Sequence, residues 1–292
     1  MMHNKYRYNI IDKIEFYLSH LFYKFLVLFE VKKPKIYLFL LDMTYSFINL
    51  VYLLKKNDKL LRYFYKISNV DYVETIFGKF YLRKNTHDSL AASSSCERRD
   101  VNFLIRNISR EIQNEKKILF LDIGADFGYY SILLSNIFKN NNLLKIYSFE
   151  PTSQSRHLFE RNIKLNNAQN IKISPFAIYK ENDSKISIVE KTVNKSNSIS
   201  LDIKNNDVEL VKTITVDSVI NETSNFDVLF IKIDIEGFET EALIGAKKTL
   251  QSNKKIYLMV EDFVDRKVID FLENTEADFV GKFNNYNSWW KF

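Results

Sequence analysis

Two glycines four positions apart, Gly124 and Gly128, lie between a short apolar segment and a segment whose pattern is typical of a helix. Glycine lets a ligand approach the backbone closely and tolerates a positive φ, so such a pair is typical of a strand-to-helix turn that binds a cofactor. Glu150 follows about 20 residues later, at the end of the next apolar segment, where a carboxylate can bind both hydroxyls of a ribose. These residues predict a site for a ligand that contains a nucleoside.

Acidic residues surround the same turn. Asp122 stands before the first glycine, and Asp126 lies between the two. A dinucleotide site instead lets a helix N-terminus meet a pyrophosphate, and two carboxylates would repel that group. They suit a cofactor that carries an ammonium group and a sulfonium, so the pattern favours S-adenosylmethionine.

A second polar cluster lies at the end of the mainly apolar segment 228–233. Lys232 and Asp234 share one phase of the strand alternation, and Glu236 lies just beyond. Ligands of an open α/β sheet bind beyond the carboxyl ends of its strands, where these side chains can meet an acceptor. Methyl transfer from a sulfonium is an in-line displacement, and an alcohol nucleophile needs a base within hydrogen-bond reach. Asp234 or Glu236 is the candidate base, and Lys232 is a further candidate catalytic residue.

Two other roles are open for the acids of this cluster. Asp234, Glu236 and Glu261 could together hold Mg²⁺, which prefers hard oxygen ligands and would acidify and orient a diol. The sequence offers no decisive ligand spacing, so we favour a site without metal. Alternatively, Asp234 and Glu236 only cap the helix that begins near Gly237, where negative charge opposes the helix macrodipole.

Strands and helices alternate along this part of the chain. Short unbroken apolar runs are typical of parallel strands that are buried on both faces. Their alternation with helical segments predicts an α/β fold. The predicted strands are residues 118–123, 145–149, 171–173 and 228–233, and the predicted helices are residues 129–138 and 237 to about 250.

With these segments the chain resembles the FkbM-type methyltransferases, which are class I S-adenosylmethionine-dependent enzymes. Members of this family mostly methylate hydroxyl oxygens of sugars and of polyketide-type metabolites. The resemblance covers roughly residues 75–263, and it implies a seven-strand, Rossmann-like class I methyltransferase sheet. It rests on six segments in the family's order: DIGADFGYYS, FEP, the later asparagines of NIKLNN, TITVDSV, KIDIEGFE and GAKKTL.

The resemblance also implies roles for single residues. It directs the polar side chains of KIDIEGFE, Glu239 among them, toward the methyl group, and it places the residues after the third strand beside the adenine. The chain departs from the family at Asp126, where asparagine is usual; a carboxylate there attracts the ammonium group of the cofactor and repels its carboxylate. The residues expected to bind the cofactor are Asp122, Gly124, Ala125, Asp126, Gly128, Glu150, Pro151, Phe176 and Ala177.

Length and composition fit one catalytic domain with an addition. The chain has 292 residues, of which 46% are apolar and 27% charged, as in a globular protein with a large core. Its single cysteine, Cys96, excludes an internal disulfide framework and a cysteine zinc cluster, and it indicates a reducing, cytoplasmic setting. The first residues lack an uninterrupted apolar stretch and a small-residue cleavage site, so we expect no secretory signal.

Residues 1–70 differ from the remainder, residues 71–292, and are predicted to form a basic, aromatic helical extension. They hold twelve Lys and Arg against five Asp and Glu. In the predicted helix 36–54, Asp42 would cost about 2.5 to 3.5 kcal/mol inside a bilayer. We expect an amphipathic helix that packs on the catalytic domain, with binding to an anionic membrane surface as the first alternative and a true membrane span as the second.

The expected function is O-methyl transfer to a hydroxyl of a glycan or a glycolipid-linked sugar, in the cytoplasm or at the inner face of the membrane. An RNA 2′-O-methyltransferase is one alternative, because the basic N-terminus could hold phosphates and Lys232 with Asp234 resembles part of a lysine–carboxylate site. No recognisable RNA module is present, so nucleic acid is not an expected partner. The other alternative is a non-catalytic cofactor-binding subunit that docks partners.

Overall fold

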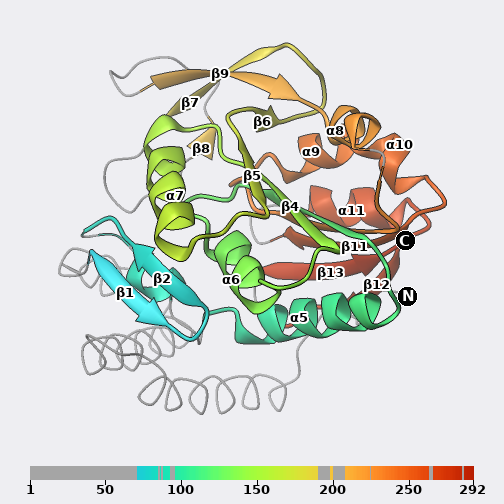
Figure 1. Cartoon of the computed structure of the whole chain (residues 1–292). Helices are drawn as coiled ribbons and strands as arrows, with labels where there is room; N and C mark the ends of the chain where they lie inside the picture. The colour runs from blue at the N-terminus through green and yellow to red at the C-terminus, as the bar shows by residue number, and fades with distance from the viewer. Residues whose placement is uncertain are drawn as a thin grey trace, which may run out of the picture. The chain divides into compact units, whose positions relative to one another are not determined.

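The computed structural model of the chain describes residues 71–84, 86, 88–92, 96–189, 198–199, 208–223, 225–262, 266–284 and 286–292 (Figure 1). The predicted helical extension of residues 1–70, with its helix at 36–54, lies outside the described residues, so its boundary and its role stay predictions. The chain divides into two compact units, Met1–Ile76 with Arg83–Arg98, and Phe77–Leu82 with Arg99–Phe292. In the first unit, the described elements are β1 (Tyr72–Thr75) and α4 (Asp88–Ala91).

A seven-stranded sheet forms the centre of the second unit and confirms the predicted seven-strand, Rossmann-like α/β sheet (Figure 1). The strand order is β12-β13-β11-β10-β3-β4-β5. Neighbouring strands are parallel from β11 to β5, whereas β13 is antiparallel to both of its neighbours. The strands are β3 (Ile118–Ile123), β4 (Leu144–Phe149), β5 (Ile171–Ser174), β10 (Val228–Ile233), β11 (Lys255–Glu261), β12 (Asp278–Gly281) and β13 (Asn287–Lys291).

The chain reverses its direction across the sheet between β3 and β10. It runs outward from β3 to β4 and β5, and it later returns to β10 and β11 on the other side of β3. Both central strands are buried along their whole length, as their mainly apolar sequences predicted, and each contains one charged residue, Asp122 or Lys232. In open α/β sheets, the crevice at the carboxyl ends of the strands beside such a switch point is where ligands bind.

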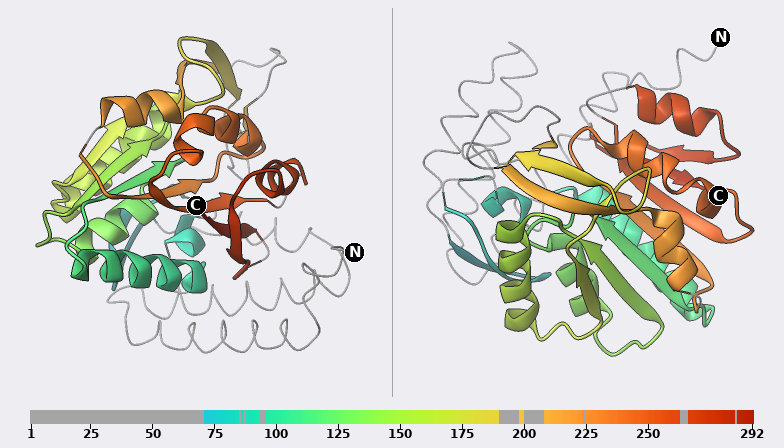
Figure 2. Two further views of the ribbon diagram at one scale, coloured as in Figure 1. Left: turned by 90° about the vertical axis from the view of Figure 1, so that its right-hand side faces the viewer. Right: turned by 90° about the horizontal axis from the view of Figure 1, so that it is seen from above.

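Helices cover both faces of this sheet (Figure 2). On one face, α8 to α11 pack against Leu121, Ile231 and their neighbours in the main apolar core. On the other face, Ser131 of α6 contacts β3 and Arg110 of α5 contacts β11. The helices of the second unit are α5 (Arg98–Gln113), α6 (Tyr129–Ile137), α7 (Ser153–Asn166), α8 (Val216–Glu222), α9 (Glu239–Ile244), α10 (Lys247–Leu250) and α11 (Lys267–Glu273).

The predicted helix from 237 to about 250 is wrong in its extent, because it consists of two short helices, α9 and α10, with a break at Gly245. The carbonyl oxygen of Gly245 accepts a hydrogen bond from the N–H of Asp217, 3.0 Å away. A Cβ at Gly245 would lie only 2.2 Å from the carbonyl oxygen of Tyr179. Both contacts are long-range, so a helical periodicity in the sequence could not reveal the break.

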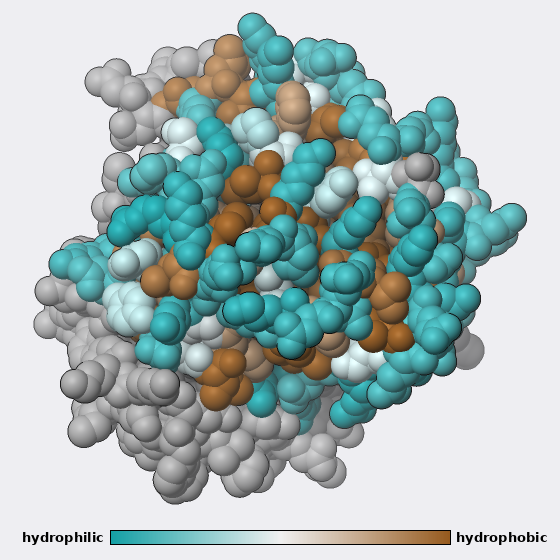
Figure 3. Space-filling model, in the orientation of Figure 1, coloured by the Kyte–Doolittle hydropathy of each residue, from teal (hydrophilic) through white to brown (hydrophobic). Residues whose placement is uncertain are grey.

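A smaller sheet follows β5, in the strand order β6-β9-β7-β8. These strands are β6 (Ala177–Ile178), β7 (Lys185–Val189), β8 (Ser198–Ile199) and β9 (Val208–Ile214). Figure 3 shows hydrophilic side chains over much of one face of the molecule, with apolar residues visible between them. Within the described ranges, none of the helices has the length and apolar character needed to cross a bilayer.

Candidate active site

The two central strands bring Lys232 and Asp122 side by side. The parallel register of β10 and β3 pairs these two residues directly. Alternate side chains of a strand share a face, so both project toward α6 and away from the core on the opposite face. Lys232 is 4% exposed and Asp122 is 1% exposed. A buried amine–carboxylate pair therefore lies just before the carboxyl ends of both strands.

The Nζ atom of Lys232 joins the groups at these strand ends. It donates hydrogen bonds to Oδ2 of Asp234 at 3.1 Å and to the carbonyl oxygen of Gly124 at 3.5 Å, and it lies 3.8 Å from Oδ1 of Asp122. It also lies 5.3 Å from the ring centroid of Tyr130, a favourable cation–π distance. The side chain of Asp234 is 39% exposed. The lysine thus connects a buried carboxylate with one that a ligand can reach.

Ser131 holds the second carboxylate oxygen of Asp122 and is itself bound to Ser148. Ser131 donates a hydrogen bond to Oδ2 of Asp122 at 2.5 Å, and its Oγ lies 2.8 Å from Oγ of Ser148. Burial raises the pKa of the Asp122 carboxyl, while the charge of Lys232 and the bond from Ser131 oppose that rise. Within the described part of the chain, Oδ1 of Asp122 accepts no hydrogen bond. This oxygen retains its capacity to accept one from a ligand.

The turn after β3 requires glycine at both predicted positions. Gly124 has a φ of +77°, and a Cβ there would lie 1.8 Å from the carbonyl oxygen of Asp234. Gly128 has a φ of +89°, and a Cβ there would lie 2.0 Å from the ring of Phe159. A side chain would therefore meet both backbone strain and a steric overlap. The glycines serve close packing within the protein, and their contact with a cofactor stays a prediction.

Glu150 lies buried beyond the end of β4 and binds the same turn. Its Oε2 accepts the N–H of Asp126 at 2.9 Å, and its Oε1 accepts the N–H and the hydroxyl of Thr152 at 2.9 and 2.6 Å. Burial and then the negative charge of Asp126 raise the pKa of Glu150 to about 7, against the hydrogen bonds from Thr152. Asp126 has a φ of +47°, which aspartate and asparagine tolerate better than most residues. The departure from asparagine therefore leaves the turn's backbone intact.

The predicted ribose and adenine positions are neighbours at this edge of the sheet. The N–H of Glu150 donates to the carbonyl oxygen of Ser174, 3.1 Å away, which ties the end of β4 to the end of β5. Phe176 and Ala177 follow β5, and the first is half-buried while the second is buried. Pro151 is also half-buried. An aromatic ring and a small apolar residue thus lie just beyond the strand that neighbours the carboxylate.

Glu239, the first residue of α9, organises the loop after β10. Its carboxylate accepts the N–H of Ile235 at 3.1 Å and that of Gly237 at 3.0 and 3.1 Å. Burial raises the pKa of Glu239, and these backbone hydrogen bonds oppose the rise. In the structure this carboxylate therefore binds the backbone of the loop, whereas the family resemblance implied that it faces the methyl group of the cofactor.

Neither Asp234 nor Glu236 is the N-cap residue of α9. That residue is Phe238, whose side chain forms no capping hydrogen bond. An effect of the two charges on the macrodipole of the helix stays a prediction. Glu236 is half-buried with a φ of +53°, in the left-handed region.

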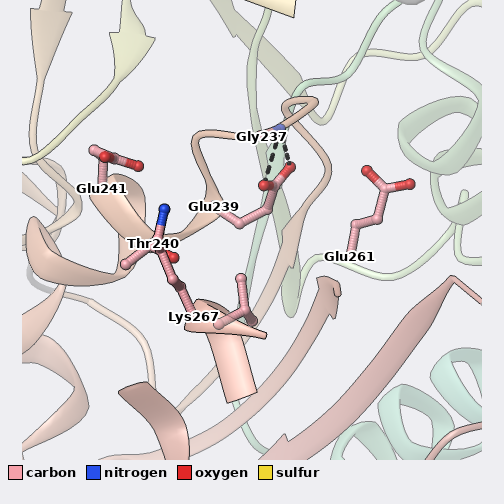
Figure 4. A pocket seen from close by; sticks show the side chains of 7 residues that line it. Gly237, Glu239, Thr240, Glu241, Glu261 and Lys267 are labelled. Carbon is pink, nitrogen blue, oxygen red and sulfur yellow. Dashed lines mark hydrogen bonds between the residues drawn. The ribbon is translucent and has the colours of Figure 1, made fainter. Parts of the chain in front are cut away.

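A cavity of about 90 Å³ lies beside this loop (Figure 4). It is found at the carboxyl ends of β10 and β11, on the opposite side of β3 from Glu150. Its lining carries more carboxylates than cationic groups, and Figure 4 shows three of these carboxylates, Glu239, Glu241 and Glu261, among the lining side chains. The lining residues are Gly237, Glu239, Thr240, Glu241, Glu261, Lys267 and Val268.

The acids proposed as magnesium ligands are not gathered into a metal site. Asp234, Glu236 and Glu261 all belong to the described residues. Among those residues, no group of three or more His, Cys, Asp or Glu side chains is arranged to hold a metal ion. The geometry of these three acids therefore gives the magnesium alternative no support.

Several residues of the site were not identified from the sequence. Ser131 and Thr152 donate to the two buried carboxylates, and Tyr130 faces the lysine. Asn162 of α7 donates to the carbonyl oxygen of Phe127 inside the glycine turn, at 2.9 Å. The available signals were a serine within the apolar helix YYSILLSNIF and the asparagines of NIKLNN. Neither pattern predicts which residue the side chain binds, because the contacts join distant parts of the chain.

Comparison with known proteins gives one family and several distant structural likenesses. The family model described as "Methyltransferase FkbM domain" matches residues 122–279. Precorrin-6y C5,15-methyltransferase from Geobacter metallireducens is similar at 17% identity over 60% of this chain and 78% of that chain, with a TM-score of 0.35. An rRNA methylase from Streptococcus thermophilus is similar at 10% identity over 60% and 86% of the two chains, with a TM-score of 0.35.

A mutant of MtNAS in complex with S-adenosylmethionine is similar at 12% identity over 70% of this chain and 65% of that chain, with a TM-score of 0.39. No curated protein sequence matches the chain.

Proposed function

We propose, since the chain belongs to the FkbM family of methyltransferases, that it methylates a hydroxyl oxygen of a glycan or a glycolipid-linked sugar. Membership of the family makes the chain an S-adenosylmethionine-dependent methyltransferase; the oxygen and the sugar are the proposed part. One observation carries the proposal: Asp234 is a partly exposed carboxylate beyond the end of β10, and Lys232 holds it at 3.1 Å.

The residues around the glycine turn fit the cofactor. Oδ1 of Asp122 can still accept a hydrogen bond. Glu150 lies close enough to Asp126 for the two negative charges to interact. The ammonium group and the ribose hydroxyls of the cofactor are hydrogen-bond donors, whereas a pyrophosphate would meet three carboxylates. Asp122 and the glycine turn would hold the methionine end, Glu150 the ribose, and Phe176 with Ala177 the adenine.

The residues after β10 supply acid–base chemistry. Bound S-adenosylmethionine provides an electrophilic methyl group on a sulfonium, suited to in-line attack by an oxygen. The Asp234 carboxylate accepts the proton of the acceptor hydroxyl as the oxygen–carbon bond forms. The ammonium of Lys232 donates a hydrogen bond to Oδ2 of Asp234 and so holds the carboxylate in position. Asp122 fixes that ammonium from the buried side.

The cavity beside the loop supports a hydroxyl-rich acceptor. Carboxylates such as those of Glu241 and Glu261 accept hydrogen bonds from hydroxyls, and the ammonium of Lys267 donates to ring or hydroxyl oxygens. The same carboxylates would repel phosphates, so this lining disfavours the RNA 2′-O-methyltransferase alternative. The non-catalytic docking subunit is also disfavoured, because the polar residues of the candidate site are all retained.

Transfer of a labelled methyl group tests the proposal. The protein is incubated with S-adenosylmethionine labelled in its methyl group and with fractionated cell extract, and Asp234→Asn serves as the control. We expect alkali-stable label in carbohydrate or glycolipid with the wild-type protein, and none with the variant. Label that enters RNA and is lost on nuclease treatment would show that the acceptor is RNA and not a sugar. Label at a nitrogen or a carboxyl oxygen would contradict methylation of a hydroxyl.

A further inference from the structure

Three asparagines bind one edge of the short strand β2 (Gly78–Tyr81). Asn136 of α6 donates to the carbonyl oxygen of Phe77 at 2.9 Å. Asn166 of α7 accepts the N–H of Lys79 at 2.9 Å and donates to its carbonyl oxygen at 2.6 Å. The side-chain amides thus satisfy backbone groups at alternate residues of the strand, as a neighbouring strand would.

Asn162 continues this pattern at Tyr81. Its Oδ1 accepts the N–H of Tyr81 at 2.7 Å, and its Nδ2 donates to the carbonyl oxygen of the same residue at 3.2 Å. Asn162 and Asn166 are four positions apart on α7, which places them on one face of the helix. Both come from NIKLNN, so this motif receives a structural role in fixing β2 against α7.

Asn162 differs from Asn166 in donating a hydrogen bond to the glycine turn. Its Nδ2 also donates to the carbonyl oxygen of Phe127 at 2.9 Å, and the side chain is fully buried. Phe127 lies between Asp126 and Gly128, which both have a positive φ. The bond therefore fixes the peptide at the centre of a strained turn, directly before α6.

We propose that Asn162 is a positioning residue for the cofactor turn, and that the docking of β2 on Asn162 thereby contributes to cofactor affinity. The inference rests on binding of S-adenosylmethionine by this turn. The amide has two N–H donors and one oxygen, and its three hydrogen bonds to Tyr81 and Phe127 use both donors. Asn166 is the matched control, because it also holds β2, while its hydrogen bonds within the described part of the chain go to Lys79, Asn136 and the carbonyl oxygen of Asn162 and not to the turn.

Affinity for S-adenosylhomocysteine separates the two asparagines. Asn162→Ala and Asn166→Ala are compared by titration calorimetry with this ligand and by thermal unfolding. We expect Asn162→Ala to weaken binding about tenfold, since it loses the bond to Phe127, and Asn166→Ala to weaken it less than about twofold even where its Tm falls as far. Equal affinities in the two variants would overturn the proposal.

A second variant gives a readout that a purely structural role would not produce. In Asn162→Asp, the ionised carboxylate retains the acceptor for Tyr81 but has no donor for Phe127, whereas its protonated form regains one. The ratio of variant to wild-type Kd should therefore fall toward one as the pH is lowered from about 8 to about 5, and the ratio for Asn162→Ala should stay constant.

A pH-independent ratio for Asn162→Asp would contradict the proposal, as would an unchanged affinity in Asn162→Ala. Should Asn162→Asp fail to fold at the higher pH, the comparison of the two alanine variants decides. Binding by the wild-type protein separates this inference from the proposed function, because calorimetry with S-adenosylhomocysteine involves no acceptor. A wild-type protein that does not bind this ligand would overturn both.

Discussion

Gly124 and Asp234 meet backbone to backbone, because a Cβ at Gly124 would lie 1.8 Å from the carbonyl oxygen of Asp234. The N–H of Asp234 also donates to the carbonyl oxygen of Ile123, 3.1 Å away. The turn after β3 and the loop after β10 therefore form one junction. The backbone of the proposed base is therefore packed directly against the proposed cofactor turn.

Gly124→Ala should disrupt this junction. The new Cβ would overlap a backbone oxygen, and the residue would keep a φ of +77°, so we expect a loss of about 3 kcal/mol in the free energy of unfolding. Gly237→Ala is the control: Gly237 also has a positive φ, but nothing lies within 4 Å of its Cβ position. Chemical denaturation should give a loss of about 1 to 2 kcal/mol for the control. Equal losses would mean that the contact with Asp234 does not restrict the site.

Glu150 should make the stability of the protein depend on pH. Its pKa is about 7 in the folded chain, against an ordinary value of 4.5 for a glutamate exposed to water. Because the folded value is raised, protonation stabilises the folded state; this contribution is complete below pH 4.5 and is lost as the pH rises through about 7. The full effect is about 3 kcal/mol. Glu150→Gln removes the titration, so the difference in stability between the two proteins should change across this range; a constant difference would contradict the raised pKa.

The same carboxyl should make cofactor affinity depend on pH. Ribose hydroxyls donate to the ionised form of Glu150, so wild-type affinity for S-adenosylhomocysteine should rise as the pH passes about 7. Glu150→Gln should bind about tenfold more weakly at high pH and lack this rise. Calorimetry at several pH values measures both quantities. A Glu150→Gln variant with wild-type affinity at high pH would show that Glu150 does not bind the ribose.

Lys232→Met should destabilise the protein by leaving Asp122 as a buried carboxylate without its cation. Removal of one partner of a buried pair costs about 3 kcal/mol or more. The loss should be smaller at acid pH, because a protonated Asp122 needs no counter-charge. Lys145→Met, at an exposed position on β4, is the control and should change stability by less than about 0.5 kcal/mol. A loss for Lys232→Met that is independent of pH would indicate lost packing alone.

The central strands could be predicted from the sequence to the residue. β3 and β10 match the predicted segments 118–123 and 228–233, because a strand that is buried on both faces leaves a mainly apolar run, which Asp122 and Lys232 interrupt only once each. The helix at 237 to about 250 could not be predicted as well, because its break depends on the approach of Tyr179 to Gly245. Local patterns predict elements well where the local sequence determines them, and less well where a distant backbone does.

The candidate site shows the same division. The strand ends that carry Asp122, Glu150 and Asp234 could be predicted from the spacing, since polar residues in or directly after the last positions of apolar runs are visible in the sequence. The hydrogen-bonding roles of Glu239 and Asn162 could not be predicted in this way, because each side chain binds backbone groups that only the folded chain brings near. Their residue types were visible in the motifs, and their partners were not.

The most direct test of the account compares Asp234→Asn with the wild-type protein in two measurements on the same preparation. Calorimetry with S-adenosylhomocysteine should give nearly equal affinities, because the variant keeps the side-chain shape and the glycine turn. Single-turnover transfer of a labelled methyl group to the acceptor should fall by about 10²- to 10⁴-fold, the usual contribution of a general base. Transfer by Asp234→Asn at the wild-type rate, with the ligand bound equally well, would contradict the proposed role of Asp234.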